Sequence, residues 1–281
     1  MGLLVLAGIV VLVAYGLHYR ALPTEAQAAA AYALPRRRTM SRSAFLAPVL
    51  GRLLPKVCAE EHAAGRLVLE RVDEAVLRDS PLARYRETHA LAKRVVDIAL
   101  ASALLLFAAP VLVAAALAVR LSGPGPVFYR QVRVGHGGKT FTLLKFRSMH
   151  VDAEAAGAVW ARKADDRVTP VGRFLRRSRI DEIPQAFNVM AGSMSFVGPR
   201  PERPEFTGLL AEQVPHYDAR HLVKPGLTGW AQVNYPYGAS VEDAANKLAY
   251  DLYYVKHFSL VLDVFIVVKT LRVAFRGEGA R

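Results

Sequence analysis

Two adjacent carboxylates, Asp181 and Glu182, follow a run of arginines in a strongly basic chain. Successive helical residues point about 100° apart, so this pair cannot hold a bond from opposite sides as the two carboxylates of a glycosidase do. The two residues must therefore differ in role. One division that fits phosphate chemistry is a carboxylate that attacks phosphorus beside a second that holds Mg²⁺. The alternative is an aspartate that only caps a helix.

Positive charge is concentrated just before the pair. Arg176, Arg177 and Arg179 lie within a few residues of Asp181, and the apolar spacing that follows predicts a helix over 182–191 with Asp181 at or near its N-cap. A helix N-terminus binds anions through its free amides and its dipole. Three arginines are more charge than the capping of one aspartate requires, and they suit a pyrophosphate.

Three further basic residues stand in short motifs elsewhere. Lys145 and Arg147 belong to the segment LLKFRSM, and Arg200 lies in Gly-Pro-Arg-Pro, where two prolines stiffen the backbone. A planar guanidinium on a stiff turn can clamp a phosphate or stack on a base, although most surface lysines and arginines are only solvated. The sequence has no HExxH, no GxSxG and no His/Cys cluster with metal-ligand spacing.

The composition limits the class of protein. The chain has 281 residues, of which 53% are apolar, and its mean hydropathy is positive, which is high for a soluble protein. Its 37 lysines and arginines exceed its 24 aspartates and glutamates. The partner is therefore expected to be anionic: lipid headgroups, nucleic acid or a phosphate-bearing substrate. The single cysteine, Cys58, excludes an internal disulfide.

Two apolar segments indicate contact with a membrane. Residues 2–17 are uncharged and basic residues follow, which favours an anchor over 1–20 with its C-terminal side in the cytoplasm; the rival is a cleaved signal peptide. Residues 98–119 are long enough to cross a bilayer once. Basic residues flank both ends and Pro110 divides the segment, so a hairpin that enters and leaves the same leaflet competes with a kinked transmembrane helix.

The remaining segments carry weaker signals. Residues 21–90 are expected to form a helical juxtamembrane region. The stretch 127–149 predicts two strands joined by the loop Gly-His-Gly-Gly. Residues 221–240 are interpreted as a loop rich in proline, glycine and aromatic residues, and 258–275 predict an amphipathic helix at the membrane interface.

Four motifs, in this order, are similar to those of a known family. The chain resembles the monotopic polyprenyl-phosphate phosphoglycosyl transferases, bacterial sugar transferases that begin exopolysaccharide, O-antigen and glycoprotein glycan assembly. The likeness covers about residues 91–281 and is closest to the subgroup found beside exosortase-type exopolysaccharide clusters. It rests on the segments KRVVDIALASALLLFAAPVL, KTFTLLKFRSM, RIDEIPQAFNVMAGSMSFVGPRPE and VKPGLTGWAQVN.

The resemblance implies a fold and a location. The fold would be α+β and mainly helical: a membrane-associated monotopic phosphoglycosyl transferase fold with a re-entrant membrane helix over 91–120, a short β-hairpin and interfacial amphipathic helices. A catalytic domain would occupy 121–281, with its active site on the cytoplasmic face of the bacterial inner membrane. A homodimer is left open, and so are the sugar that is transferred and the role of residues 1–90.

The resemblance also implies a role for each carboxylate. Asp181 would attack the β-phosphate of a UDP-sugar, release UMP and hold the phosphosugar covalently until undecaprenyl phosphate takes it. Glu182 would carry Mg²⁺. This is physically coherent, because an aspartate near a helix N-terminus stays ionised, and Mg²⁺ with the arginines neutralises the charge that repels it from a diphosphate.

The expected substrate-binding residues are Lys145, Arg147, Arg176 and Arg200. Arg176 matches the family's phosphate-contacting arginine, Lys145 the lysine of the KFR motif, and Arg200 the Pro-Arg-Pro arginine linked to nucleotide recognition. Arg147 is assigned to the same group as a further donor in LLKFRSM.

The chain departs from the family pattern in two places. Arg179 stands where a hydroxyl residue is usual, which affects how the first phosphate is held, and Ala109-Pro110 stands where Ser-Pro is usual. Two other classes of protein compete with a transferase. A membrane-tethered nucleic-acid binder would explain the charge, but no reader motif is present, so no nucleic-acid partner is expected. A non-catalytic scaffold of the same fold is the other rival, and the intact carboxylate pair argues against it.

Overall fold

The structure is a computed structural model of the chain, and it describes residues 64–69, 72–73, 77, 89–153, 165–236, 238 and 240–276. The anchor predicted over 1–20 and most of the helical region predicted over 21–90 lie outside the described residues. The predicted catalytic part is described except for 154–164, 237, 239 and 277–281.

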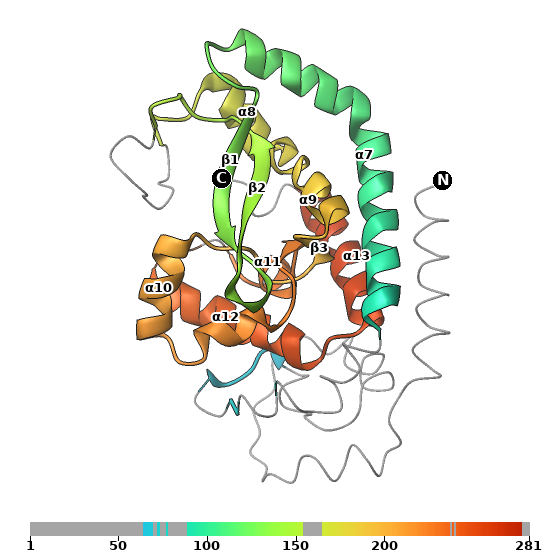
Figure 1. Cartoon of the computed structure of the whole chain (residues 1–281), viewed down its shortest axis with the longest axis vertical. Helices are drawn as coiled ribbons and strands as arrows, with labels where there is room; N and C mark the ends of the chain where they lie inside the picture. Colours follow the sequence, from blue (N-terminus) through green and yellow to red (C-terminus); the bar gives the residue numbers. More distant parts are fainter. Residues whose placement is uncertain are drawn as a thin grey trace.

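Helices dominate the described part, and two small sheets of two strands each accompany them (Figure 1), in agreement with the predicted mainly helical α+β fold. The helices are α7 Ala90–Leu121, α8 Pro170–Arg177, α9 Gln185–Ala191, α10 Pro204–Gln213, α11 Trp230–Asn234, α12 Val241–Lys256 and α13 Leu260–Arg276. The strands are β1 Phe128–Val134, β2 Thr140–Phe146, β3 Ser195–Val197 and β4 Gly226–Thr228. Three 3₁₀ turns complete the order: η3 His136–Gly138, η4 Ile180–Glu182 and η5 Tyr217–Leu222.

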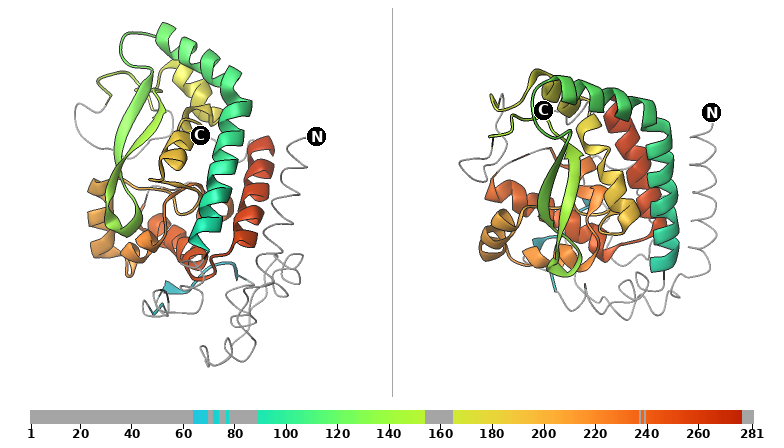
Figure 2. Two further views of the ribbon diagram at one scale, coloured as in Figure 1. Left: turned by 45° about the vertical axis from the view of Figure 1, so that its right-hand side comes forward. Right: turned by 45° about the horizontal axis from the view of Figure 1, so that its top comes forward.

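The longest element is α7, which covers the apolar segment predicted to enter a membrane. It runs through Pro110 as one continuous helix of 32 residues. Figures 1 and 2 show that its axis bends and that its C-terminal part lies across α8. A proline inside a helix removes a backbone hydrogen bond and clashes with the preceding turn, which causes such bends. The segment is thus a bent helix instead of two separate arms, and its re-entrant placement stays a prediction.

One face of α7 is apolar and exposed. Within the described part of the chain, α7 is the one helix long and apolar enough to cross a membrane, judged by length and composition. Exposed apolar surface of this extent marks contact with a membrane or a partner. The exposed residues include Leu91, Val95, Leu106, Phe107, Val113, Leu117 and Leu121.

A buried ionic network ties α7 to the rest of the protein. Nζ of Lys93 lies 2.9 Å from Asp97 and 3.0 Å from Asp263 of α13. Asp97 also accepts hydrogen bonds from the Ser195 hydroxyl and the Phe196 amide of β3. Because buried polar groups must find partners inside the protein, these contacts fix the position of α7 on β3 and α13.

β1 and β2 form the predicted antiparallel hairpin, and its loop carries Gly137 with φ 64°. Tyr129 lies opposite Lys145, and Arg130 lies opposite Leu144. Successive side chains in a strand point to opposite faces. Tyr129 and Lys145 therefore share one face of the hairpin, and Arg130 and Leu144 share the other.

The second sheet lies in the segment 221–240, which the sequence predicted to be a loop. That prediction is wrong, because the segment contains β4 and α11. β4 pairs in parallel with β3, Ser195 lying opposite Gly226. The backbones approach so closely here that a Cβ on Gly226 would lie 2.1 Å from the amide nitrogen of Gly198. Only a glycine allows this pairing.

The main core is formed largely by α11, α12 and α13. Trp230 stacks on Tyr253 with ring centroids 5.8 Å apart, and Leu262 and Ile266 of α13 are fully buried beside them. The helix predicted over 258–275 is confirmed as α13. Its inner face packs into this core, and its placement at a membrane interface stays a prediction.

Candidate active site

Asp181 and Glu182 lie in η4, a 3₁₀ turn between α8 and α9. Arg179 precedes the turn in the left-handed region with φ 59°, which redirects the chain between the two helices. α9 begins only at Gln185 with Pro184 as its N-cap, so the predicted helix start at about 182, with Asp181 at or near the N-cap, is wrong. The cause is Pro184, which has no N–H to donate to the preceding turn and separates η4 from α9.

Arg200 holds Glu182 in its ionised form. Nη2 of Arg200 donates to Oε1 at 2.5 Å and Nη1 donates to Oε2 at 3.4 Å, while Nη1 of Arg179 lies 3.8 Å from Oε2. Burial works against the charge, but Arg200, and after it Arg179 and Lys145, outweigh burial and lower the pKa of Glu182 to about 2. Glu182 is therefore an anion near neutral pH.

Asp181 has a different environment although it is the adjacent residue. It is 7% exposed, and its Oδ1 has no hydrogen-bond partner among the described residues. Burial, followed by the charge of Glu182, raises the pKa of Asp181 to about 6 in spite of Lys145, Arg176 and Arg200. Two carboxylates whose pKa values are pushed apart suit different roles. At neutral pH Asp181 is mostly ionised and has a free oxygen, as a nucleophile requires.

Lys145 reaches the pair from β2. Burial, with added repulsion from Arg133, lowers the pKa of Lys145 to about 8, although Glu182 and Asp181 act to raise it. Its Nζ lies 5.2 Å from the ring centroid of Tyr129, its cross-strand neighbour. Because burial removes the screening by water, a charge in this position acts strongly on a nearby phosphate.

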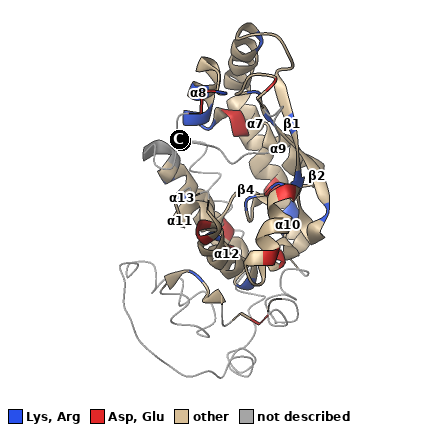
Figure 3. Ribbon diagram, turned by 90° about the vertical axis from the view of Figure 1, so that its left-hand side faces the viewer, with Lys and Arg blue, Asp and Glu red and all other residues tan. Residues whose placement is uncertain are grey.

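α8 brings Arg176 to the same place. Nε of Arg176 donates to Oγ of Ser148 at 2.8 Å, and its charge acts to lower the pKa of Asp181. The start of α8 packs closely against the backbone of Ser148. A Cβ on Gly172 would lie only 1.9 Å from the Ser148 carbonyl oxygen. Thr169 caps the helix by accepting a hydrogen bond from the Gly172 amide. Figure 3 shows the basic residues of α8 and of the hairpin in blue.

Arg147 is directed at the end of α7. Its guanidinium donates to the carbonyl oxygens of Val119, Gly123 and Pro124 at 3.0, 2.9 and 2.5 Å. A Cβ on Gly125, which has φ +108°, would lie 2.3 Å from Nη1, so a glycine is required beside it. Arg147 satisfies carbonyl groups that the helix leaves open at its C-terminus. These hydrogen bonds give Arg147 a structural role, and its predicted contact with substrate stays a prediction.

Arg220 supports Arg200 from the side of the core, and the sequence pattern did not reveal it. Its Nη2 donates to the carbonyl oxygen of Arg200 at 2.9 Å and to Asp251 Oδ2 at 2.7 Å, and its Nη1 donates to the Tyr217 hydroxyl at 2.7 Å. Burial opposes its charge, but Tyr217 and Asp251 prevail and raise the pKa of Arg220 above its ordinary value. No local spacing connects these residues in the sequence.

Arg133 of β1 also belongs to the site. It donates to the carbonyl oxygen of Pro201 at 3.0 Å and lies 3.6 Å from Glu202, next to the Gly-Pro-Arg-Pro turn. Arg133 follows Tyr129 by four residues, so strand alternation places it on the hairpin face that carries Lys145. The register of the predicted hairpin could have identified it.

Glu182 supplies oxygen donors of the kind that Mg²⁺ takes. This ion takes oxygen ligands and is commonly held by one or two carboxylates together with substrate phosphates. The carboxylate of Glu182 meets this need, and Arg200 donates a hydrogen bond to each of its two oxygens. The described residues contain no group of three or more His, Cys, Asp or Glu side chains placed to hold a metal. The phosphates of a substrate would therefore have to complete the coordination.

A comparison with known proteins matches the part of the chain that contains this site. Residues 88–277 match the model of a family described as bacterial sugar transferase. The UDP-N-acetylgalactosamine-undecaprenyl-phosphate N-acetylgalactosaminephosphotransferase of Aeromonas hydrophila is 43% identical over 224 residues, which cover 79% of this chain and 52% of the relative. The UDP-glucose:undecaprenyl-phosphate glucose-1-phosphate transferase of Escherichia coli (strain K12) is 43% identical over 206 residues, which cover 73% of this chain and 44% of the relative.

A shorter relative is matched over nearly its whole length. The exopolysaccharide production protein PSS of Rhizobium leguminosarum bv. phaseoli is 41% identical over 194 residues, which cover 66% of this chain and 97% of the relative. The chain spans about half the length of the first two relatives. The matched region begins beside α7 and includes every residue of the site described above.

Proposed function

The chain belongs to the bacterial sugar transferase family, and on that premise we propose that it transfers a phosphosugar from a UDP-sugar to undecaprenyl phosphate. The first two relatives act, by name, on UDP-sugars and undecaprenyl phosphate. The observation that carries the proposal is the environment of Asp181. It is a buried carboxylate with a free oxygen, next to an ionised Glu182 and within the field of Lys145, Arg176 and Arg200.

The transfer would take place in two displacements at one phosphorus. In the first, a carboxylate oxygen of Asp181 bonds to the sugar-bearing β-phosphorus of the UDP-sugar, and the bond from that phosphorus to the bridging oxygen breaks. The bridging oxygen leaves with UMP and keeps the electron pair. In the second, an oxygen of undecaprenyl phosphate bonds to the same phosphorus and the Asp181 oxygen leaves. The product is undecaprenyl-diphosphate sugar, and the carboxylate returns to its starting state.

The charges around Asp181 address the main obstacle, which is repulsion between a carboxylate and a diphosphate. Lys145, Arg176 and Arg200 supply positive charge, and a pKa of about 6 leaves Asp181 mostly ionised at neutral pH. Mg²⁺ bound at Glu182 would neutralise further charge on the phosphates. Arg200 keeps Glu182 in place and ionised through its two hydrogen bonds.

The exposed apolar face of α7 supports a position at the membrane. The phosphate of undecaprenyl phosphate lies at headgroup depth, and a UDP-sugar arrives from the cytosol, so an enzyme held at this surface can serve both substrates from one site. We assign the protein to the cytoplasmic face of the bacterial inner membrane. We assign the reaction to exopolysaccharide synthesis, and the name of the Rhizobium relative supports this assignment.

The test is UMP release by the purified protein in detergent from a panel of UDP-sugars, with undecaprenyl phosphate and Mg²⁺ present. Asp181→Asn should lower the rate by more than about a thousandfold, because it removes the nucleophile. Asp166→Asn, a change of an exposed carboxylate before α8, is the matched control and should stay within about twofold.

A second readout identifies the intermediate. Without acceptor, wild-type protein incubated with the active donor should gain the mass of one phosphosugar on the peptide that contains Asp181. Folded wild-type protein that releases UMP from no donor would contradict the proposal and favour a non-catalytic scaffold. An Asp181→Asn variant that keeps its activity would contradict the assignment of the nucleophile.

A further inference from the structure

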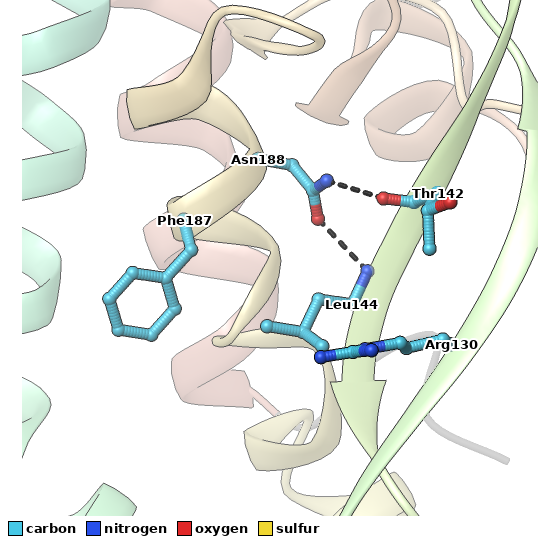
Figure 4. A pocket seen from close by; sticks show the side chains of 5 residues that line it. All are labelled: Arg130, Thr142, Leu144, Phe187 and Asn188. Atoms are coloured by element: carbon cyan, nitrogen blue, oxygen red, sulfur yellow. Dashed lines mark hydrogen bonds between the residues drawn. The ribbon is translucent and has the colours of Figure 1, made fainter.

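A hollow of about 430 Å³, here called the hairpin hollow, opens between β2 and α9 (Figure 4). It lies on the hairpin face opposite to the one that carries Lys145, because consecutive residues of a strand point to opposite faces. None of the residues assigned a role in the two displacements lines it. Its lining residues are Arg130, Thr142, Leu144, Phe187 and Asn188.

The polar groups in the wall of the hairpin hollow are already paired. Nδ2 of Asn188 donates to the Thr142 carbonyl oxygen at 2.7 Å, and its Oδ1 accepts from the Leu144 amide at 2.9 Å (Figure 4). Asn188 thus satisfies the hydrogen-bonding groups of the β2 backbone at this point. The side chains of Leu144 and Phe187 remain as contact surface, which favours an apolar ligand over a polar one.

Arg130 adds a positive charge to this surface. It lies opposite Leu144 in the register of the hairpin and is exposed. Within the part of the chain that the structure describes, no hydrogen bond or ion pair engages its guanidinium. An apolar wall beside an available guanidinium complements a ligand that has an apolar chain and a phosphate end.

The hairpin hollow borders α9, the helix that follows the carboxylate pair and contacts the membrane helix α7. α9, which carries Phe187, begins three residues after Glu182. Phe187 is 49% exposed, and Met190, one turn further along α9, is 38% exposed. The Met190 carbonyl accepts a hydrogen bond from Arg94 of α7, and its sulfur lies 3.5 Å from the Ser102 hydroxyl. The exposed apolar surface therefore continues from the hollow toward α7.

We propose that the hairpin hollow binds the part of the undecaprenyl chain next to the phosphate, and that Arg130 contacts the phosphate end. This inference rests on the proposed function, which requires a prenyl phosphate to reach Asp181. An apolar chain gains little by leaving lipid tails for an apolar protein surface. Recognition therefore depends on close packing against Phe187 and Leu144 and on the charge of Arg130. Phospholipids also have apolar chains and a phosphate, and the tests below distinguish a phospholipid from undecaprenyl phosphate.

The first test measures both half-reactions in Phe187→Ala and Arg130→Gln. Each variant should raise the KM for undecaprenyl phosphate about threefold to tenfold, while UMP release without acceptor and the KM for the UDP-sugar stay within about twofold. Two matched controls should leave all of these values within about twofold. They are Phe174→Ala, an exposed aromatic of α8 outside the hollow, and Lys139→Gln, an exposed cation at the end of the hairpin.

Three outcomes of this test would overturn the inference. One is an unchanged acceptor KM in both hollow variants. Another is an equal rise in Phe174→Ala, which would indicate general contact with lipid or detergent. The third is an Arg130→Gln variant that loses activation by added phosphatidylglycerol but keeps its acceptor KM, which would assign the hollow to a phospholipid.

The second test does not depend on turnover. Geranyl phosphate that carries a benzophenone is crosslinked to the full chain in detergent, and the labelled peptides are mapped by mass spectrometry. Label should appear within Thr140–Phe146 or Gln185–Ala191 and should be displaced by undecaprenyl phosphate; label elsewhere would overturn the inference. Protein that is labelled in the hollow but releases no UMP would contradict the proposed function alone. Active protein labelled elsewhere would contradict only the inference.

Discussion

The buried ion pair behind Arg200 can be tested by replacing its two members separately and together. Arg220 is 5% exposed, Asp251 is 2% exposed, and Nη2 lies 2.7 Å from Oδ2. The variants are Asp251→Leu, Arg220→Met and the double variant, because leucine and methionine approximate the replaced volumes without charge.

The expected loss of stability follows from the burial of the pair. Removing one partner leaves the other charge buried without compensation, which costs about 3–5 kcal/mol. For a unit the size of the matched region 88–277, each kcal/mol lowers Tm by about 2–4 °C, so each single variant should unfold about 6–20 °C lower. Burial raises the pKa of Asp251 to about 6 although Arg220 is adjacent. Desolvation thus offsets much of the attraction, and the double variant should regain most of the lost stability.

In the double variant, we expect the stability to recover but the activity to stay low. Arg220 also donates to the carbonyl oxygen of Arg200 at 2.9 Å, which methionine cannot do. With Arg200 less well positioned on Glu182, UMP release should stay at least about tenfold below wild type even when Tm has recovered.

The assays are thermal unfolding by circular dichroism in detergent and UMP release at saturating donor. Asp218→Leu changes an exposed carboxylate of η5 and serves as the control, with an expected effect on the free energy of unfolding within about 0.5 kcal/mol. A double variant as unstable as the single variants would refute the coupling. A stable double variant with full activity would refute the positioning of Arg200 by Arg220.

Two further predictions concern single residues. Arg147→Met removes three hydrogen bonds to backbone carbonyls and should cost about 2–3 kcal/mol of stability while the KM for the UDP-sugar stays within about twofold; a large rise in that KM without loss of stability would restore the predicted substrate contact. In metal-free protein, a carbodiimide, which reacts with protonated carboxyl groups, should label Asp181 increasingly as pH falls through about 6 but should not label Glu182, whose pKa is about 2. Glu182→Gln removes a negative neighbour and should move the Asp181 midpoint to lower pH, and a midpoint unchanged by this variant would refute the coupling of the two carboxylates.

Sequence patterns predicted the elements whose signal extends over many residues. The apolar run of α7, the alternation in the hairpin and the amphipathic spacing of α13 each indicate one structure over many residues. The segment 221–240 was interpreted wrongly because β4 is only three residues long and its pairing depends on the close approach of Gly226 to Gly198, which are far apart in the chain. Such an approach is a tertiary contact, and local composition carries no sign of it.

Among the basic residues too, local patterns predicted some positions, and tertiary contacts decided others. Lys145 and Arg147 are two positions apart, so a continuous strand would present both on one face. β2 ends at Phe146, and Arg147 turns instead to the end of α7. Strand ends are the least reliable part of a prediction from sequence, and here the end of the strand separates a residue beside the carboxylate pair from a structural one.

The different environments of Asp181 and Glu182 arise from the turn that carries them. In the predicted helix start, Asp181 would be an N-cap whose oxygens accept hydrogen bonds from backbone amides, and the helix dipole would lower the pKa of both carboxylates. In η4 the Oδ1 of Asp181 has no such partner, and burial raises its pKa instead.

Arg179 contributes to this difference in two ways. Its left-handed backbone, with φ 59°, costs on the order of 1–3 kcal/mol for a residue with a side chain, and it sets the turn in which Asp181 is buried. Its guanidinium lies 3.8 Å from Glu182 and adds to the charge that keeps this carboxylate ionised. The arginine that departs from the family pattern therefore acts on Glu182, and Oδ1 of Asp181 keeps no hydrogen-bond partner among the described residues, which the proposed attack on phosphorus needs. This division depends on the backbone at 179–182, which the residue types alone do not reveal.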